Sequence, residues 1–267
     1  MSEHIIYHIA DGIATLTLNR PKVLNAINYD LLKELDELLD QAAADDSLRV
    51  LILTGSGKAF AAGADIAQQA GMDQEEAAKW GRYGSGIFRR LECFPIPTLA
   101  VVNGYALGGG CEMAMACDLI LAGEKAKFGQ PETGLGITPG FSGTQRLLRR
   151  VGVSKAKELI YTGRMIDAQE ALQIGLADHI YPDDQLQAEA LAMAKKIAAN
   201  APVAVRYAKC AINEGAQADI DTAIAIENKW FSKCFATQDQ RKACRHSSKS
   251  ARQHSSISSL QIKIKAE

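Results

Sequence analysis

The chain has 267 residues, of which 47% are hydrophobic and 23% charged, a composition typical of a globular protein with a large core. Its 30 basic and 31 acidic residues nearly cancel, so no overall field favours nucleic acid or an anionic membrane. Apolar runs fall far short of the roughly 20 residues of a membrane helix. We therefore expect a cytoplasmic protein with neither a nucleic-acid nor a membrane partner.

Four short segments have the pattern of β-strands. Apolar and polar residues alternate over residues 13–18, whereas residues 49–53, 98–102 and 119–121 are continuous apolar runs. Polar or glycine-containing turns follow the first three of these segments. Because helical patterns separate several of the strands, we expect an α/β fold with crossover connections.

Helical spacing dominates the remaining segments. Asn28 is placed to cap a helix in which leucines recur at helical spacing up to Ala44. Residues 73–91 have a second helical pattern, and from Gln145 onward we expect almost only helices. The continuity of the second helix is in question because three glycines each weaken it by about 1 kcal/mol relative to alanine: Gly81, Gly84 and Gly86.

The sequence supplies little for histidine, serine or metal chemistry. Its five histidines are not spaced as zinc ligands, no Gly-x-Ser-x-Gly elbow occurs, and the six cysteines include no CxxC pair. We therefore expect no metal site and reduced intracellular thiols. Carboxylates remain as the expected acid and base.

Three glycine-rich segments stand out, at residues 58–66, 103–112 and 128–140. Glycine and alanine leave the backbone accessible to a ligand. In the second segment, three glycines at 108–110 open a helical stretch through Cys117, whose N-terminus favours negative charge nearby. A tight turn that needs glycine for packing would explain one such segment, but it is a poor explanation of all three.

Together these segments resemble the signature of the crotonase (enoyl-CoA hydratase/isomerase) superfamily, and the resemblance extends from the first strand to about Arg241. Within that superfamily the chain is similar to bacterial short-chain enoyl-CoA hydratases, also called 3-hydroxybutyryl-CoA dehydratases. The resemblance implies a spiral of repeated ββα units over residues 1–199, followed by C-terminal helices over 200–242 that assemble a homotrimer or a dimer of trimers. It also implies reversible syn hydration of a short-chain trans-2-enoyl-CoA, with no cofactor because CoA is part of the acyl-CoA thioester substrate.

Glu112 and Glu132 are the candidate acid and base. Nearly all neighbours of Glu112 are apolar, and a buried carboxylate needs partners or a raised pKa, although a solvated acid in the first turn of a helix is the alternative. Glu132 by itself has the character of an ordinary loop residue. The resemblance implies that both hold one water, with Glu112 as the main base for addition at C3 and Glu132 as the acid that protonates C2.

Backbone donors are the second catalytic element that the resemblance implies. Attack on an enoyl thioester moves negative charge onto its carbonyl oxygen, and N–H groups that already point there lower the barrier. The motif match assigns this role to the N–H groups of Ala64 and Gly109.

The resemblance also implies contacts with the rest of the substrate. The residues concerned match segments that pass the adenine of CoA (Ala62, Asp65 and Ile66), approach its phosphates (Lys22), or border the reacting end (Gly140 and Phe141). A solvated surface lysine explains Lys22 nearly as well. A further set falls in a segment that lines the acyl pocket in relatives, and the core face of an amphipathic helix explains it equally well: Met72, Tyr83, Ile87 and Phe88.

Two alternatives remain beside the hydratase. One is an enoyl-CoA isomerase or acyl-CoA hydrolase on the same scaffold. The other is a non-catalytic acyl-CoA-binding or RNA-binding protein, for which the basic residues between 241 and 252 are the only support. A run of charge of this kind is usually a solvated surface.

Residues 243–267 depart from the superfamily pattern. They are rich in serine, lysine, arginine and glutamine with almost no apolar periodicity, so we expect a disordered tail. Members of the superfamily end in a helix resembling Gly-Met-Pro-Ala-Phe-Ile-Glu-Lys-Arg-Lys, and permitted codons for residues 243–253, read one base earlier, encode that ending. We hypothesise a frameshift near residue 242, which resequencing of the gene will test.

Overall fold

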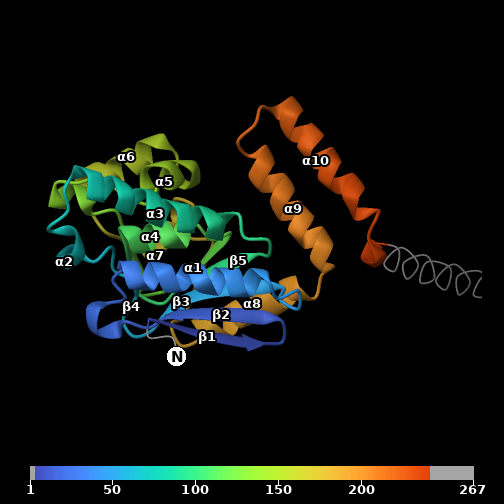
Figure 1. Cartoon of the computed structure of the whole chain (residues 1–267), viewed down its shortest axis with the longest axis horizontal. Coiled ribbons are helices and arrows are strands. Elements are labelled where there is room, and N and C mark those ends of the chain that lie inside the picture. Colours follow the sequence, from blue (N-terminus) through green and yellow to red (C-terminus); the bar gives the residue numbers. More distant parts are fainter. Residues whose placement is uncertain (1–3, 241–267) are drawn as a thin grey trace, which may run out of the picture. The chain divides into compact units, whose positions relative to one another are not determined.

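The strands of the first unit of the chain, Met1–Ala199, divide between two sheets. The computed structural model describes residues 4–240. The larger sheet has the order β1-β2-β3-β5-β7-β10, and the smaller has the order β4-β6-β8-β9. Figure 1 labels the strands β1 to β5. Strands β1 and β9 are antiparallel to their neighbours, and the other pairs are parallel. The strands are β1 (Ile5–Ala10), β2 (Ile13–Leu18), β3 (Val50–Gly55), β4 (Ala59–Ala61), β5 (Thr98–Val102), β6 (Tyr105–Leu107), β7 (Leu119–Gly123), β8 (Lys127–Gly129), β9 (Ile166–Asp167) and β10 (His179–Tyr181).

One structural unit recurs along the chain: a strand of the larger sheet, a strand of the smaller sheet, and then a helix. Strands β3 and β4 precede α2 (Ile66–Gln69) and α3 (Gln74–Glu92), whereas β5 and β6 precede α4 (Gly109–Met115). Strands β7 and β8 precede the 3-10 helix η2 (Glu132–Leu135) and α5 (Gly143–Val151). The expected spiral of ββα units is thus confirmed. Because β4, β6 and β8 are parallel neighbours, the segments that follow them meet at one edge of the smaller sheet.

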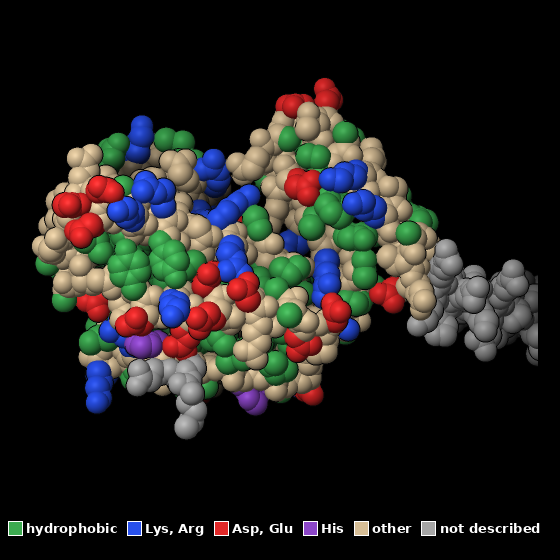
Figure 2. Space-filling view, in the orientation of Figure 1, with side chains coloured by type: hydrophobic (Ala, Val, Ile, Leu, Met, Phe, Trp, Pro, Cys, Tyr) green, Lys and Arg blue, Asp and Glu red, His purple; other side chains and the backbone are tan. Residues whose placement is uncertain are grey.

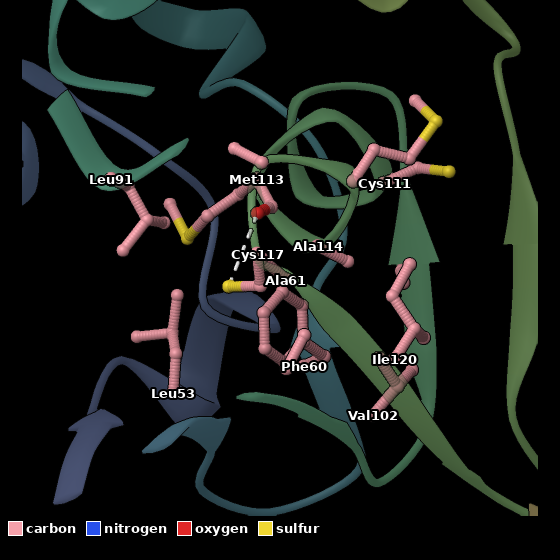
Figure 3. Packing of buried hydrophobic residues seen from close by; sticks show 14 of the residues in the cluster. Leu53, Phe60, Ala61, Leu91, Val102, Cys111, Met113, Ala114, Cys117 and Ile120 are labelled. Atoms are coloured by element: carbon pink, nitrogen blue, oxygen red, sulfur yellow. Dashed lines mark hydrogen bonds between the residues drawn. The ribbon is translucent and has the colours of Figure 1, made fainter. Parts of the chain in front are cut away.

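The central strands of the larger sheet are buried on both faces, as the burial of every residue of β3 and β5 shows, whereas the edge strand β1 is largely exposed. Helix α8 (Leu186–Ala198) packs on one face through Leu186, Ala190 and Ala194. The main core, which includes side chains of α1 (Tyr29–Ala43), α3 and α4, covers the other face. All seven residues of α4 are buried, and Figure 3 shows Cys117, which follows the helix, beside Phe60 of the smaller sheet.

Two helices begin at well-formed caps. The side chain of Asn28 accepts a hydrogen bond from the N–H of Leu31 at 3.0 Å, as the sequence predicts. Asp73 and Glu76 form a reciprocal capping box at the start of α3, which then runs unbroken through its glycines. At Gly84 a Cβ atom would lie 2.3 Å from the ring of Phe141, so this glycine allows an aromatic ring to approach the helix.

Several elements of the first unit differ from the sequence prediction. The strands β9 and β10 interrupt the segment after Gln145 that we expected to be almost only helical, and the N-terminal strand β1 precedes the strands we predicted. Helix α4 ends at Met115 rather than Cys117. Strands of two or three residues are too short to give a readable period. The remaining helices are η1 (Pro21–Val23), α6 (Val153–Thr162) and α7 (Ala168–Gln173).

The second unit, Asn200–Glu267, contains the helices α9 (Pro202–Gly215) and α10 (Ile220–Cys234), which pack against each other. The rings of Tyr207 and Trp230 lie 5.0 Å apart between them. Several large apolar side chains of this unit are exposed: Ile212, Ile220, Ile224, Phe231 and Phe235. The predicted tail, residues 243–267, lies outside the described residues.

The surface and the helices carry two further observations. Acidic and basic side chains are intermixed over the face shown in Figure 2. Among residues 4–240, the helices are too short or too polar to cross a membrane.

Candidate active site

The segments that follow β4, β6 and β8 enclose a cavity of about 790 Å³. This volume is within the range of pockets that hold small organic ligands. Its wall combines backbone-exposing glycines and alanines, apolar side chains and two carboxylates. The residues lining it are Ala62, Gly63, Ala64, Ile66, Gln69, Met72, Ala77, Trp80, Gly81, Gly108, Gly109, Glu112, Pro131, Glu132, Thr133, Leu135, Gly136, Ile137, Thr138, Gly140 and Phe141.

Glu112 projects from α4 and is held by the backbone of a neighbouring turn. Its side-chain Oε1 accepts hydrogen bonds from the N–H of Phe141 at 2.8 Å and the N–H of Gly143 at 2.6 Å. The residue between these donors, Ser142, has a φ of 77°, which is uncommon outside glycine. This turn directs two N–H groups at one carboxylate oxygen and so fixes the orientation of the Glu112 side chain. The residue itself is only 1% exposed.

Glu132 begins η2 and approaches the cavity from another side. Its Oε2 is buried and has no hydrogen-bond partner among the described residues. Its Oε1 would lie only 2.7 Å from a Cβ atom at position 108, where Gly108 has a φ of 48°. Glycine is therefore required at position 108 both by backbone conformation and by the close approach of the carboxylate.

Both glutamates have raised pKa values. Burial and, secondarily, the charge of Glu132 raise the pKa of Glu112 to about 8, against the lowering effect of its two N–H donors and of Arg146. Burial raises the pKa of Glu132 to about 7. Because both pKa values lie near neutral pH, the two carboxyls can share one proton, and either carboxyl can be the ionised member of the pair.

Two backbone N–H groups complete the site. Ala64 follows β4, and its neighbours are fixed to Ile27, which donates to the carbonyl of Gly63 at 2.9 Å and accepts from Asp65 at 2.8 Å. Gly109 is the first residue of α4, where a helix leaves its N–H groups without intrahelical partners. Both residues line the cavity, and neither N–H donates to another residue of the described chain. These donors are suited to hold an oxygen that develops negative charge.

The other predicted substrate contacts divide into two groups. Ala62, Ile66, Gly140 and Phe141 line the cavity. Asp65 and Lys22 do not. Asp65 instead caps α2 by accepting from the N–H of Ala67 at 3.2 Å and pairs with Arg20 at 3.5 Å, whereas Lys22 is exposed in η1.

Of the predicted acyl-pocket residues, only Met72 lines the cavity, whereas Tyr83, Ile87 and Phe88 pack in or against the core. Helix α3 contributes a different face, formed by Ala77, Trp80 and Gly81. Their spacing of three and four residues is the signal that could have identified this face. The ring of Trp80 lies 5.1 Å from the ring of Phe141 in an edge-to-face arrangement.

Sequence reasoning missed the residues that hold Glu112 in place. Gly143 and Ser142 act through the backbone, and no residue type predicts where an N–H group points. Arg146, which donates to the carbonyl of Phe141 at 2.9 Å, was also missed. An arginine in a polar helix gives no sign that its side chain is 8% exposed.

Comparisons with known proteins agree with this architecture. Residues 8–253 match the family model described as enoyl-CoA hydratase/isomerase. The chain is 52% identical to the short-chain-enoyl-CoA hydratase of Clostridium acetobutylicum, covering 90% of this chain and 92% of that protein. It is 48% identical to the crotonyl-CoA hydratase of Syntrophomonas wolfei, covering 90% and 93%. The crystal structure of an enoyl-CoA hydratase from Bacillus anthracis superposes with a TM-score of 0.89 at 41% identity, covering 92% of this chain and 96% of that one.

Proposed function

Because this chain belongs to the enoyl-CoA hydratase/isomerase family, we propose that it catalyses the reversible syn addition of water to short-chain trans-2-enoyl-CoA, interconverting crotonyl-CoA and 3-hydroxybutyryl-CoA. One observation carries the proposal. Two buried glutamates with raised pKa values line the same cavity as two backbone N–H groups that have no acceptor within residues 4–240. Enoyl-CoA hydration is also the activity for which the relatives at 52% and 48% identity are named.

The glutamates divide the proton transfers between them. The carboxylate of Glu112 removes a proton from water while the water oxygen bonds to C3 of the enoyl group. The electrons of the double bond move onto the thioester carbonyl, and the protonated carboxyl of Glu132 then delivers a proton to C2 on the same face. The product is the 3-hydroxyacyl thioester, and the roles reverse for dehydration. Two hydrogen bonds to one oxygen of Glu112 support its role as the oriented base.

The N–H groups of Ala64 and Gly109 hold the thioester oxygen during these transfers. Negative charge on that oxygen is greatest in the enolate, so preformed donors stabilise the transition state more than the substrate. The N-terminus of α4, at which Gly109 lies, adds a favourable partial positive charge.

The CoA moiety passes Ala62, Asp65 and Ile66, and Lys22 lies near its phosphates. The N–H of Ala62 donates to the carbonyl of Leu24 at 3.0 Å, which joins the loop after Lys22 to the rim of the cavity. Replacing Lys22 with alanine should raise the KM for crotonyl-CoA and leave kcat unchanged, because phosphate binding contributes equally to ground and transition states. An unchanged KM would remove Lys22 from the binding site.

The protein assembles as a homotrimer or a dimer of trimers through its second unit. Exposed apolar side chains on α9 and α10, among them Phe231 at 62% exposed, support this assignment. Analytical ultracentrifugation should find trimers or hexamers, and Phe231→Ser should shift the distribution toward smaller species. A monomeric wild-type protein would contradict the proposal.

Initial rates on enoyl-CoA thioesters of four, six, eight and sixteen carbons test the reaction. We expect the largest kcat/KM for the four-carbon substrate, with 3-hydroxyacyl-CoA as product. The same assays should include a 3-enoyl-CoA, whose conversion would indicate an isomerase, and a free-thiol reagent, since release of CoA would indicate a hydrolase. Failure to hydrate any of the four thioesters would refute the proposed function.

A further inference from the structure

A buried arginine lies directly behind the turn that holds Glu112. Arg146 belongs to α5 and is 8% exposed. Its Nη1 donates to the carbonyl of Phe141 at 2.9 Å, and its Nη2 donates to Oε2 of Glu92 at 3.1 Å. The same Phe141 donates its own N–H to Glu112. One residue of the turn is therefore held from both sides, by the guanidinium through its carbonyl and by the carboxylate through its N–H.

Glu92 anchors this arrangement to another helix. It is the last residue of α3 and also accepts a hydrogen bond from Arg89 at 2.6 Å. Although burial opposes it, the hydrogen bonds and charges of Arg89 and Arg146 lower the pKa of Glu92, so its carboxyl is ionised at neutral pH. A continuous series of contacts thus runs from α3 through Glu92 and Arg146 to the turn and on to Glu112.

The turn needs such support because its backbone is strained. Ser142 holds a left-handed conformation at a φ of 77° without the freedom of glycine, a geometry that persists only where surrounding contacts enforce it. Loss of the guanidinium would leave the carbonyl of Phe141 without its donor in a buried place. The turn could then relax, and its two N–H groups would no longer meet Oε1 of Glu112.

We propose that Arg146, anchored by Glu92, is a positioning residue for hydration, because it fixes the turn whose N–H groups aim Glu112 at the substrate water. The inference rests on the proposed function, which names Glu112 as the base. It adds a residue that is not part of the cavity wall and acts through the peptide backbone of Phe141.

The charge of Arg146 also favours the role of Glu112 as a base, because it lowers the pKa of that carboxyl. The charged groups that influence Glu112 are Glu132, which raises its pKa, and Arg146, which lowers it. The adjacent thiol of Cys111 stays neutral because burial raises its pKa to about 12. Removing the guanidinium charge would therefore raise the pKa of Glu112 further and leave less of the carboxylate form that acts as a base.

The chain offers a matched control on the same helix. Arg150 also donates to a backbone carbonyl, that of Cys117 at 2.9 Å, and pairs with a carboxylate, Asp178 at 3.6 Å. It makes no contact with the turn at 141–143 among the described residues. Arg146→Gln and Arg150→Gln thus each remove a partly buried ion pair and a hydrogen bond to a backbone carbonyl, and only the first of these supports Glu112.

The experiment compares Arg146→Gln, Arg146→Lys and Arg150→Gln in steady-state assays with crotonyl-CoA across pH. We expect Arg146→Gln to lower kcat roughly 10- to 100-fold with little change in KM, since a misplaced catalytic group costs about that much. Its pH profile should move upward, because the positive charge that lowers the pKa of Glu112 is gone. Arg146→Lys should restore the position of the profile because it keeps the charge, with an intermediate kcat. Arg150→Gln should change neither.

A second measurement separates this inference from the proposed function. Carboxyl ¹³C NMR, with the Glu112 signal assigned from Glu112→Gln, should report a higher pKa for Glu112 in Arg146→Gln than in wild type. If wild type does not hydrate crotonyl-CoA, the proposed function fails, and this titration still decides whether Arg146 sets the state of Glu112. An unchanged pKa and an unchanged kcat in folded Arg146→Gln would overturn the inference.

If Arg146→Gln does not fold, Glu92→Gln carries the kinetic test. This variant keeps the guanidinium charge and its bond to Phe141 but loses the negative charge on α3 that pairs with Arg146. We expect a several-fold lower kcat, an unchanged KM and no upward movement of the pH profile. A wild-type kcat in the folded variant would overturn the role of Glu92 and of the anchored pair.

Discussion

The two carboxylates of the cavity sit in walls of different construction. Glu112, in a wall formed by α4 and the turn at 141–143, receives two backbone N–H groups on one oxygen. Glu132, in a wall formed by η2 and Gly108, keeps a buried oxygen without a partner among the described residues. Burial is the largest cause that raises the pKa of both carboxyls, whereas the two N–H donors orient Glu112 and also oppose the rise of its pKa.

This difference suits the two proposed tasks. A base that activates water must be aimed, because proton removal and attack at C3 occur in one geometry. An acid that delivers a proton needs an oxygen free to meet its target, and an unsatisfied buried oxygen in a cavity is commonly a functional one. The wall around Glu112 therefore fixes the position of its carboxylate, and the wall around Glu132 leaves one carboxyl oxygen available for proton transfer.

Removing either carboxylate should have the largest effect. Glu112→Gln and Glu132→Gln should each lower turnover by at least about 10²-fold, the contribution of a general acid or base, while binding of CoA esters persists. Steady-state kinetics and calorimetric titration with a CoA ester measure the two quantities. Near-wild-type turnover in either variant would show that the two walls do not share the reaction.

Removing the donor between the walls should come next. Gly109→Pro deletes the N–H that faces the thioester oxygen, and loss of one such donor costs about 10²- to 10³-fold in kcat. Proline suits the first position of a helix, but its Cβ would lie 3.2 Å from the ring of Phe141, so the fold of the variant has to be checked. Circular dichroism must match that of wild type for the assay to count. A folded variant with full activity would refute the donor assignment.

A glycine substitution in each wall sharpens the comparison. In Gly143→Ala the new Cβ would lie 2.8 Å from Oε1 of Glu112, so the carboxylate must move, and we expect a loss of kcat of roughly 10- to 100-fold. In Gly134→Ala, within η2, the new Cβ meets nothing within 4 Å and should leave kcat unchanged. Equal effects of the two substitutions would contradict the idea that the wall of Glu112 needs the more exact geometry.

The pH dependence of kcat/KM should report the ionisation of both carboxyls. The reaction needs one carboxyl ionised and the other protonated, so activity should fall below about pH 7 as both become protonated and above about pH 8 as both ionise. In Glu132→Gln the negative charge that raises the pKa of Glu112 is gone. Its residual activity should therefore follow a single titration, that of Glu112, with a pKa below about 8 and no alkaline limb. A profile that keeps both limbs would mean that Glu132 is not the second titrating group.

Much of the fold was visible in the sequence where the pattern was long enough. The cap at Asn28, strand 13–18 and strand 98–102 were predicted to within the bounds that the structure shows. The smaller sheet was not predicted, because β4, β6 and β8 have three residues each and give no period. Those strands determine where the segments after them meet, so the site itself depended on recognising the glycine-rich motifs.

The sequence indicated the candidate residues of the site but not the contacts that hold them in place. The apolar neighbours of Glu112 indicated a buried carboxylate, and the motif match indicated Glu132 and the two donors. What could not be read was the support from the backbone, since it depends on the φ angle of Ser142. The partner of Arg146 was equally hidden, because Glu92 is 54 positions away and the contact exists only after α3 and α5 pack.

The glycines of α3 show what this packing means for anyone who wishes to make the protein more heat-resistant. Alanine in place of a helix-interior glycine is a standard stabilising change worth about 0.5–1 kcal/mol. Gly86 should accept it, since its Cβ would enter open space, and thermal denaturation should record the gain. At Gly84 the same methyl would be driven into the ring of Phe141. The same substitution at two positions of one helix should therefore raise the thermal stability at Gly86 and displace the ring of Phe141 at Gly84.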